Sequence, residues 1–327
     1  MILAGDIGGT NARLALYAPG KARPAREASI PSREHASLES VVLAFLGNKP
    51  PKIQAATFGI AGPVVLGRVK TTNLPWAVDE KTLARRLGIP HVHLINDLVA
   101  LALGAVNASA GKLRSLTGGS LPAKKGQNLA IIAAGTGLGE AGLVWTRGGF
   151  VPLGSEGGHA DFAPRSIIES ELLEFLSKRY GDHVSNERVV SGPGLGNVYD
   201  FFRDGKGMLE ATEISAQIAA APDRNAEIGR LGVAGTSPVA SRALQMFMSV
   251  YGAETGNLAL KVLATGGVYV AGTIAASLQG SLAAGPFVPS FTGKGRMKSL
   301  LEKIPVAVVT DSKIGLAGAA HHAESFA

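Results

Sequence analysis

Two glycine-rich turns, far apart in the chain, most constrain how this sequence can fold. They are Gly5-Asp6-Ile7-Gly8-Gly9-Thr10 and Gly135-Thr136-Gly137-Leu138-Gly139. Each turn follows a short apolar run and precedes residues that again have the pattern of a strand. Each is therefore predicted to be the tip of a β-hairpin whose glycines let the backbone approach a ligand closely. Two such tips facing each other can hold a polyphosphate through backbone N–H groups and threonine hydroxyls.

The composition is that of a globular protein with enough residues for two cores. The chain has 327 residues, of which 46% are hydrophobic and 17% are charged. The formal net charge of +7 is spread along the chain, and the densest basic stretches, 21–26 and 294–303, are short and interrupted. We therefore expect no nucleic-acid partner. The lack of cysteine excludes disulfides, thiolate zinc sites and cysteine nucleophiles.

No apolar segment of the sequence reaches membrane-spanning length. The nearest candidate, residues 98–106, is far too short to cross a bilayer. The first apolar run stops at Asp6 and has no basic residues before it, unlike a signal peptide. We therefore expect a cytoplasmic protein without a membrane partner.

The hydrophobic pattern predicts two units of different style. In the first, strands are expected at 2–6, 13–17, 25–30, 55–60, 66–71 and 92–95, with helices at 38–46, 81–87 and 98–103. This order predicts one mixed sheet covered by helices. The polar, glycine-rich span 107–127 is the candidate crossing between the units. The second unit is expected to contain a hairpin at 129–145, helices over 167–264 and strands at 268–271 and 305–309, before a terminal helix at 314–320. We thus predict a small domain of residues 1–107 plus 305–327 and a large domain of residues 108–304.

Two acidic positions follow predicted strands in the first unit. Asp6 can hold a magnesium ion through water, or it can simply bond to its own turn. Asn96-Asp97 lies between a strand and an apolar helix. Asp97 can be an ordinary helix N-cap, or a carboxylate at the carboxyl end of a strand that accepts a proton from a substrate hydroxyl.

The second unit offers a polar loop and a further carboxylate. The segment 154–162 places Glu156, His159 and Asp161 beside two glycines, which suits hydrogen bonding to a small polyol. Glu156 with His159 can also form half of a metal site, although the remaining histidines do not obviously complete it. Glu187, just before a Ser-Gly-Pro-Gly turn, is either another acceptor or a helix-start carboxylate. Residues 137–142 match G-x-G-x-x-G, but a strand pattern follows them, which argues against a dinucleotide site.

The order of these motifs resembles that of the bacterial glucokinase family, hexose kinases with the actin-like ATPase fold. The resemblance covers nearly the whole chain, apart from about 201–241. It is carried by residues 5–16, 95–97, 134–139, 156–164, 187–195 and 266–268.

This resemblance implies an α/β, two-domain actin-like ATPase fold (ribonuclease H-like, hexokinase-type) with a cleft between the domains. It implies Asp97 as the catalytic base, and it implies that glucose hydroxyls are bound by Asn96, Asp97, Glu156, His159 and Glu187. The residues implied to bind ATP are Gly5, Asp6, Ile7, Gly8, Gly9, Thr10, Gly135, Thr136 and Gly137 at the phosphates and Gly266 and Gly267 near the adenosine. Asp6 would also place Mg²⁺ through water, and the family pattern implies a homodimer.

The implied reaction is ATP-dependent phosphorylation of glucose at its 6-hydroxyl. A non-catalytic sugar sensor on the same fold is the alternative from another class. Residues 60–63 and 73–76 resemble instead the repressor-related sugar kinases, which leaves mannose, fructose or N-acetylglucosamine open as the acceptor. The cysteine-bound zinc site of those relatives cannot form here.

Overall fold

The computed structural model describes residues 1–71, 74–119, 121 and 126–327. Asn73 of the 73–76 segment, and residues 120 and 122–125 of the expected domain crossing, lie outside this description. The described chain divides into two compact units. The first comprises Met1–Lys112, Ala141–Gly154 and Asp311–Ala327, and the second comprises Leu113–Glu140 and Ser155–Thr310.

These bounds differ from the predicted domains at three places, the first of which is that the first unit extends to Lys112 instead of residue 107. The segment from 305 to 310 belongs to the second unit, because strand β13 (Val306–Val309) pairs there with β12 (Gly267–Ala271) and β8 (Leu113–Ser115). The return to the first unit therefore comes at Asp311. Residues 141–154, which we placed in the large domain, are grouped with the first unit.

The first unit contains the predicted mixed sheet. Its strand order is β3-β2-β1-β4-β7, with bounds β1 (Ile2–Ile7), β2 (Asn11–Tyr17), β3 (Arg26–Pro31), β4 (Ala55–Ile60) and β7 (His91–Asn96). Strand β2 is antiparallel to both of its neighbours, β1 and β3, whereas β1, β4 and β7 run parallel. Strands β5 (Arg68–Lys70) and β6 (Ala77–Asp79) form a separate pair. The helices are α1 (Leu38–Leu46), α2 (Glu80–Leu87), α3 (Asp97–Val106) and α13 (Ile314–Glu324).

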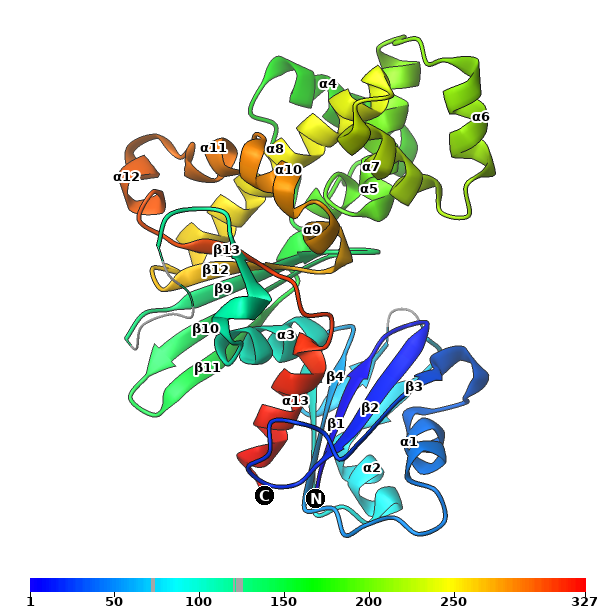
Figure 1. Ribbon diagram of the computed structural model, residues 1–327, viewed down its shortest axis with the longest axis vertical. Coiled ribbons are helices and arrows are strands. Elements are labelled where there is room, and N and C mark those ends of the chain that lie inside the picture. The colour runs from blue at the N-terminus through cyan, green and yellow to red at the C-terminus, as the bar shows by residue number, and fades with distance from the viewer. Residues whose placement is uncertain (72–73, 120, 122–125) are drawn as a thin grey trace. The chain divides into compact units, whose positions relative to one another are not determined.

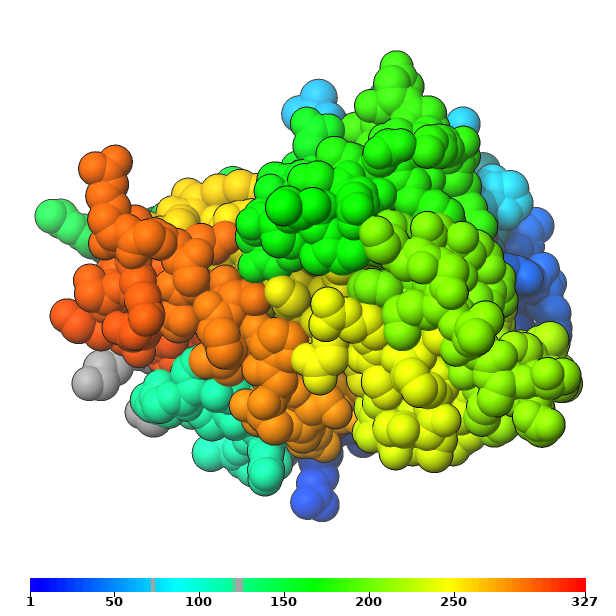
Figure 2. Space-filling model, turned by 90° about the horizontal axis from the view of Figure 1, so that it is seen from above, coloured from blue at the N-terminus to red at the C-terminus, as the bar shows by residue number. Residues whose placement is uncertain are grey.

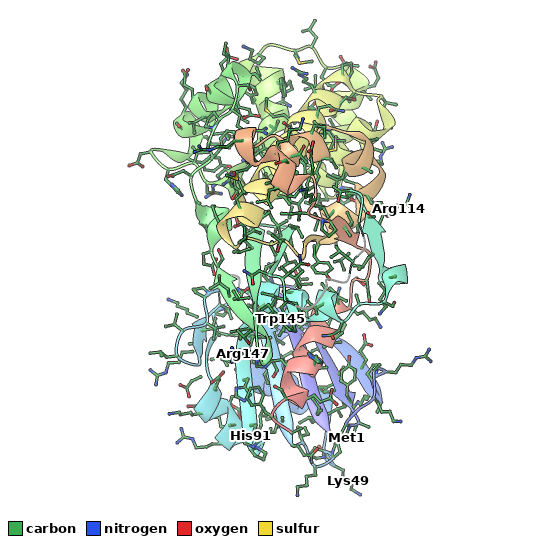
Figure 3. The ribbon with its side chains drawn as sticks, turned by 90° about the vertical axis from the view of Figure 1, so that its left-hand side faces the viewer. Met1, Lys49, His91, Arg114, Trp145 and Arg147 are labelled. Carbon is green, nitrogen blue, oxygen red and sulfur yellow. The ribbon has the colours of Figure 1, made fainter. Side chains whose placement is uncertain are left out.

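The strand register brings the carboxyl ends of the parallel strands to one edge of this sheet. Ile7 pairs with Ile60, and Ile60 pairs with Asn96. The amino ends lie at the opposite edge, where Figure 3 labels Met1 and His91. Asp6, Asn96 and Asp97 therefore occur at the same edge, as expected for ligand-binding positions of an α/β sheet.

Helices α3 and α13 pack unusually closely, although they are more than 200 positions apart in the chain. Figure 1 shows α13 beside α3 and along β1. Glycines at the crossing permit this approach, because a Cβ atom at Gly318 would collide with the carbonyl oxygen of Ala100, and one at Gly104 with that of Ile314. The small residues of the terminal helix therefore serve close packing.

The second sheet has the order β11-β10-β9-β12-β13-β8, and the second unit contains all of β8, β9, β12 and β13 with the beginning of β10. The strands not yet bounded are β9 (Leu129–Ala134), β10 (Leu138–Thr146) and β11 (Gly149–Ser155). Strands β9, β12 and β13 are parallel, with Gly267 opposite Leu129 and Ala271 opposite Ala133. The tip of the β10–β11 hairpin carries Trp145 and Arg147 (Figure 3).

A large helical layer packs against this sheet. Its helices are α4 (Ile167–Tyr180), α5 (Gly192–Asp200), α6 (Thr212–Ala220), α7 (Arg224–Ala234), α8 (Pro238–Lys261), α9 (Thr273–Ser277), α10 (Gln279–Ala284), α11 (Phe287–Thr292) and α12 (Lys298–Leu301). Short 3₁₀ helices cover Ser32–Glu34, Ala110–Lys112, Gly157–His159, Asn186–Arg188 and Gly295–Met297, and a π-helical turn covers Phe201–Gly205. Figure 2 shows α11 (orange) lying against the long α8 (yellow).

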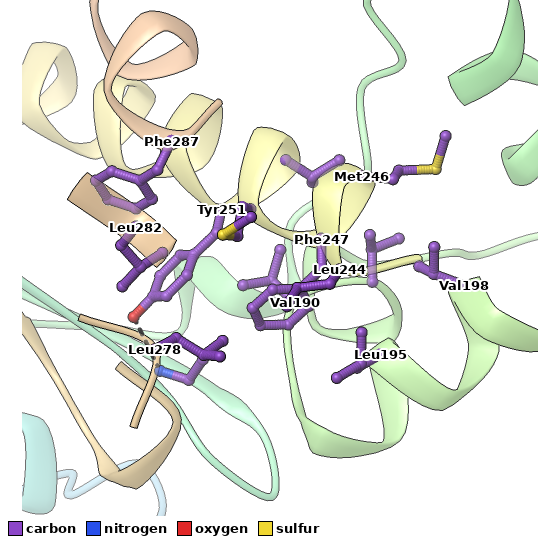
Figure 4. Close-up of a cluster of buried hydrophobic side chains, with 14 of the residues drawn as sticks. Val190, Leu195, Val198, Leu244, Met246, Phe247, Tyr251, Leu278, Leu282 and Phe287 are labelled. Carbon is purple, nitrogen blue, oxygen red and sulfur yellow. Dashed lines mark hydrogen bonds between the residues drawn. The ribbon is translucent and has the colours of Figure 1, made fainter. Parts of the chain in front are cut away.

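Helix α8 is the centre of the second core. Tyr251 and Phe247 are fully buried and stack edge to face with their neighbours (Figure 4). The hydroxyl of Tyr251 accepts a hydrogen bond of 3.3 Å from the amide of Ala134, the last residue of β9. The helical core thereby supports the end of the strand that precedes the second glycine turn.

We predict that Gly318→Ala destabilises the protein by about 1–3 kcal/mol, because the added methyl group forces α3 and α13 apart. Urea unfolding measures this as a lower transition midpoint. The control is Gly280→Ala in α10, where a Cβ has open space, and where helix propensity favours alanine by about 1 kcal/mol. Equal midpoints for the two variants would contradict the proposed packing.

Candidate active site

The first glycine turn is fixed by Ser32. Its hydroxyl donates to the carbonyl of Gly8 (2.8 Å), and its amide donates to the carbonyl of Thr10 (2.9 Å). Within the turn, the amide of Gly8 donates to the carbonyl of Asn11 (3.0 Å). The predicted hairpin tip is confirmed, because β1 and β2 pair antiparallel on either side of it. Gly9 remains partly exposed and Thr10 fully so, which leaves both accessible to a ligand.

Gly5 and Ile7 lie inside β1 and serve the core. A Cβ atom at Gly5 would lie 2.5 Å from a ring carbon of Phe58 and 3.0 Å from a methyl carbon of Leu14. Ile7 is buried among apolar residues. Contact of these two residues with a nucleotide stays a prediction, to which the structure adds a packing role for each.

Asp6 lies on the same strand, directly opposite Arg13 of β2. A guanidinium nitrogen of Arg13 is 3.6 Å from the Asp6 carboxylate and also donates to the carbonyl of Ser312 (3.1 Å). Burial raises the pKa of Asp6, and the positive charge of Arg13 opposes that shift. Gly315 of α13 leaves room beside this carboxylate, since a Cβ there would lie 3.6 Å from its Cγ.

Asn96, rather than Asp97, is the N-cap of α3. The side-chain oxygen of Asn96 accepts from the Leu98 amide (2.9 Å), and its amide nitrogen donates to the carbonyl of Gly62 (3.2 Å). Asp97 is the first residue of the helix, where one of its oxygens also accepts from the Leu98 amide (3.0 Å). Its carboxylate is therefore held at the positive end of α3, at the same sheet edge as Asp6.

The second glycine turn is bonded on two sides. The amide of Gly135 donates to the carbonyl of Gly137 (2.8 Å), and the amide of Gly192 donates to the carbonyl of Gly135 (2.8 Å). Gly192 is the first residue of α5, so the positive end of that helix faces the turn. On the other side, the carboxylate of Glu187 accepts from the amide of Leu138 (3.0 Å).

The polar loop of residues 156–161 lies against the same turn. A Cβ atom at Gly158 would collide with the carbonyl oxygen of Leu138. The loop is also bonded to the segment before Glu187, because the amide of Asn186 donates to the carbonyl of Ala160 (2.9 Å). The structure therefore brings together the second turn, the 156–161 loop and Glu187, with the side chains of Glu156 and His159 exposed.

One residue that supports this loop was not anticipated from the sequence. His183 contacts the carbonyl of His159 through Nε2 (3.0 Å) and the carboxylate of Asp161 through Nδ1 (3.0 Å). It lies in a loop between α4 and the Glu187 segment, with no motif around it to draw attention.

A pocket of about 860 Å³ opens on the opposite side of the second turn. Its walls are Gly135 and Thr136 of the turn, the beginning of α5, the exposed side of α7, and α9. The α5 and α9 walls rest on Leu195 and Leu278, which belong to the core around α8 (Figure 4). The α7 wall lies in the segment that carries little of the family resemblance, so nothing in the sequence indicated it.

Gly266 and Gly267, predicted to lie near the adenosine, do not line this pocket. Gly267 begins β12 opposite Leu129, at the amino end of the parallel strands, where it packs against Leu121 and Pro305. The pocket lies at the other end, beyond Ala271, where Thr273 and Ile274 contribute to its wall. Their contact with the adenosine stays a prediction, and the Gly272-Thr273 turn at the other end of β12 is the one beside the pocket.

Among the residues that the structure describes, no group of three or more His, Asp or Glu side chains is arranged to hold a metal ion. In the same part of the chain, no helix is both long and apolar enough to cross a membrane.

We predict that Glu187 stabilises the second turn as well as facing the candidate site. Glu187→Ala leaves the part-buried amide of Leu138 without its acceptor, which costs about 1–3 kcal/mol in the free energy of unfolding. Glu187→Gln retains a side-chain oxygen for this bond and serves as the matched control. Denaturant unfolding without any ligand measures both, and an Ala variant as stable as the Gln variant would refute the bracing role.

The chain matches known proteins over its whole length. The family model described as Glucokinase matches residues 3–326. The chain is 40% identical to glucokinase of Trichormus variabilis, covering 98% of each chain. It is also 40% identical to glucokinase of Synechocystis, covering 97% of this chain and 96% of the relative.

Solved structures agree with this result. The crystal structure of a glucokinase from an Antarctic psychrotroph has 32% identity and a TM-score of 0.84, covering 99% of this chain and 98% of that one. A ROK family glucokinase from Streptomyces griseus, at 22% identity and a TM-score of 0.66, shares the fold, covering 99% of both chains. The predicted α/β fold of the actin-like ATPase class is thereby confirmed. The chain belongs to the glucokinase family.

Proposed function

We propose that this chain transfers the γ-phosphoryl group of ATP to the 6-hydroxyl of glucose, giving glucose 6-phosphate and ADP. Membership of the glucokinase family supports this activity. The structural observation that carries the proposal lies within the second unit. One glycine turn forms a wall of a large pocket on one side, and contacts Glu187 and the 156–161 loop on the other. If ATP, the phosphoryl donor, and glucose, the acceptor, bind on opposite sides of this turn, their reacting groups meet at the turn.

The pocket suits the nucleoside part of ATP. Its volume of about 860 Å³ is within the range of small-molecule sites. The beginning of α5 and the amides of the 135–137 turn supply positive dipoles for phosphate groups. In the related Streptomyces griseus structure the bound molecules are glucose and AMPPNP, an ATP analogue. Thr273 and Ile274, which line the pocket, are proposed near the adenosine in addition to Gly266 and Gly267.

We assign the binding of the glucose hydroxyls to polar side chains. Glu156 can accept hydrogen bonds from a polyol, His159 can donate or accept them, and the second oxygen of Glu187 remains available beside its bond to Leu138. Asn96 already bonds to Leu98 and Gly62, but its side chain retains one N–H and one lone pair. The related glucokinase of Balamuthia mandrillaris is described in complex with glucose.

The proposed chemistry needs one base and charge neutralisation. Asp97 orients the 6-hydroxyl and takes its proton as the phosphoryl group is transferred. Gly8 to Thr10 of the first turn and the 135–137 turn are assigned to the phosphates. Asp6 is a single carboxylate, which suits Mg²⁺ because this ion keeps several waters and phosphate oxygens as ligands. Bound there, Mg²⁺ would supply positive charge that neutralises the phosphates.

We predict that Asp97→Asn retains glucose binding but loses about two to four orders of magnitude in kcat, the usual effect of removing a general base. A coupled assay of ADP release measures turnover, and calorimetry measures glucose binding. The control is Asp79→Asn at the N-terminus of α2, where the carboxylate caps Thr82; its kcat should be unchanged. A near-normal rate for Asp97→Asn would remove Asp97 from the role of base.

We predict that Ala226→Trp, which fills the pocket from α7, raises the KM for ATP about tenfold or more, equivalent to about 1.4 kcal/mol of binding. Glucose affinity should be unchanged, because the sugar side chains lie across the turn. Ala220→Trp on the exposed side of α6 is the matched control. If both variants bind ATP normally, the nucleotide lies elsewhere.

The coupled assay of ADP release also distinguishes the two alternative functions, a sugar sensor and a kinase for another hexose. A non-catalytic sugar sensor would bind glucose without releasing ADP. A different hexose specificity would appear as a higher kcat/KM for mannose, fructose or N-acetylglucosamine than for glucose in one panel. The homodimer and the cytoplasmic location remain parts of the proposal. Sedimentation of the purified protein tests the first, and cell fractionation tests the second.

A further inference from the structure

A buried carboxyl group lies directly beneath the 156–161 loop. Glu140, on β10, is only 1% exposed, and its Oε1 has no hydrogen-bond partner. Its other oxygen is pressed against the loop, so that a Cβ atom at Gly157 would collide with it. The proposed sugar-binding residue Glu156 is the immediate neighbour of this contact. His159, the other predicted site residue of the loop, is two positions after Gly157.

The remaining surroundings of Glu140 come mainly from α8. Glu254, which is 3% exposed, faces it with a second carboxyl group. Glu254 is itself bonded to Asn257 (2.8 Å) and to Lys261 (3.3 Å). Beyond Asn257, Lys294 donates to its side-chain oxygen (2.5 Å). The Tyr251 hydroxyl also faces Glu140; burial raises the pKa of this tyrosine, and the charge that Glu140 carries when ionised adds to the shift.

This arrangement favours a neutral Glu140. Burial, and then the charge of Glu254, raise the pKa of Glu140 to about 7, while Lys261 opposes the shift. Glu254 has Lys261 and Asn257 to stabilise its charge, whereas the free oxygen of Glu140 has none. An ionised Glu140 carboxylate would need hydrogen bonds from water or from additional donor groups. Helix α8 is largely buried, whereas Gly157 of the loop is partly exposed to solvent.

We propose that Glu140 is a positioning residue for glucose: in its neutral form it supports the 156–161 loop at Gly157, and its ionisation displaces the loop and weakens sugar binding. This inference rests on the proposed function, because it assigns glucose to that loop. The ATP pocket lies on the other side of the second turn and is unaffected.

The decisive experiment compares the pH dependence of wild type with that of Glu140→Gln, which retains the size of the side chain but cannot ionise. In wild type, the KM for glucose should rise at least threefold between pH 6 and pH 8, while the KM for ATP and kcat show no matching change. In Glu140→Gln the KM for glucose should stay at its low value over this range. Glu174→Gln, at an exposed carboxylate of α4, is the matched control and should retain the wild-type profile.

A second variant keeps the inference testable if Glu140→Gln does not fold. Gly157→Ala places a methyl group against Glu140 and should raise the KM for glucose at every pH without changing that for ATP. A wild-type profile in Glu140→Gln, or an unchanged glucose KM in a folded Gly157→Ala, overturns the inference.

Unfolding measurements separate this inference from the proposed function. Because the folded-state pKa of Glu140 is raised above its unfolded value, its contribution to stability is lost as pH rises from about 4.5 towards 7. Glu140→Gln should therefore gain stability relative to wild type across that window, whatever the substrate. An enzyme that shows this gain but phosphorylates no glucose would refute the proposed function alone. Equal stability of the two proteins across the window would refute the buried neutral carboxyl.

Discussion

The bond between the Glu187 carboxylate and the Leu138 amide is the contact on which the second unit depends. It fixes one side of the 135–137 turn, while Gly192 at the beginning of α5 fixes the other. Leu138 is the first residue of β10 and Glu187 lies in a 3₁₀ helix, so this bond joins the turn to a segment 49 positions further along the chain. Glycine at 137 is also required here, since a side chain would occupy the space of the carboxylate. The turn is therefore held by its contacts with Glu187 and Gly192. Its glycines leave space for these contacts as well as for a ligand.

The strands and the polar motifs could be predicted from the sequence because their signals are local. Apolar runs that end in glycine turns identified β1, β2, β9 and β10, and the Asn-Asp pair identified the beginning of α3. The choice of Asn96 over Asp97 as the cap could not be predicted, since both residue types cap helices well. The α7 wall and the bracing His183 depend on contacts between distant segments, for which one sequence contains no pattern.

The two glycine turns around β12 illustrate the same limit. Gly266-Gly267 and Gly272 flank a single strand of five residues, and both ends have the composition of a turn. Only the parallel register with β9, in which Ala271 lies opposite Ala133, shows which end reaches the pocket. Strand direction is a property of the whole sheet, so the local composition alone was a poor guide to the ligand-facing end.

The contact between α3 and α13 has a consequence for how the protein is made. The helix that packs beside Asp6 and against α3 consists of nearly the last residues of the chain. During synthesis, β1, β4 and β7 emerge from the ribosome some two hundred residues before α13 does. The N-terminal sheet must therefore wait, with the surface of Ala4, Ala15 and Ala55 uncovered, while the entire second unit is translated and folds. Docking of α13, rather than closure of the first sheet, is the step that completes the edge that carries Asp6.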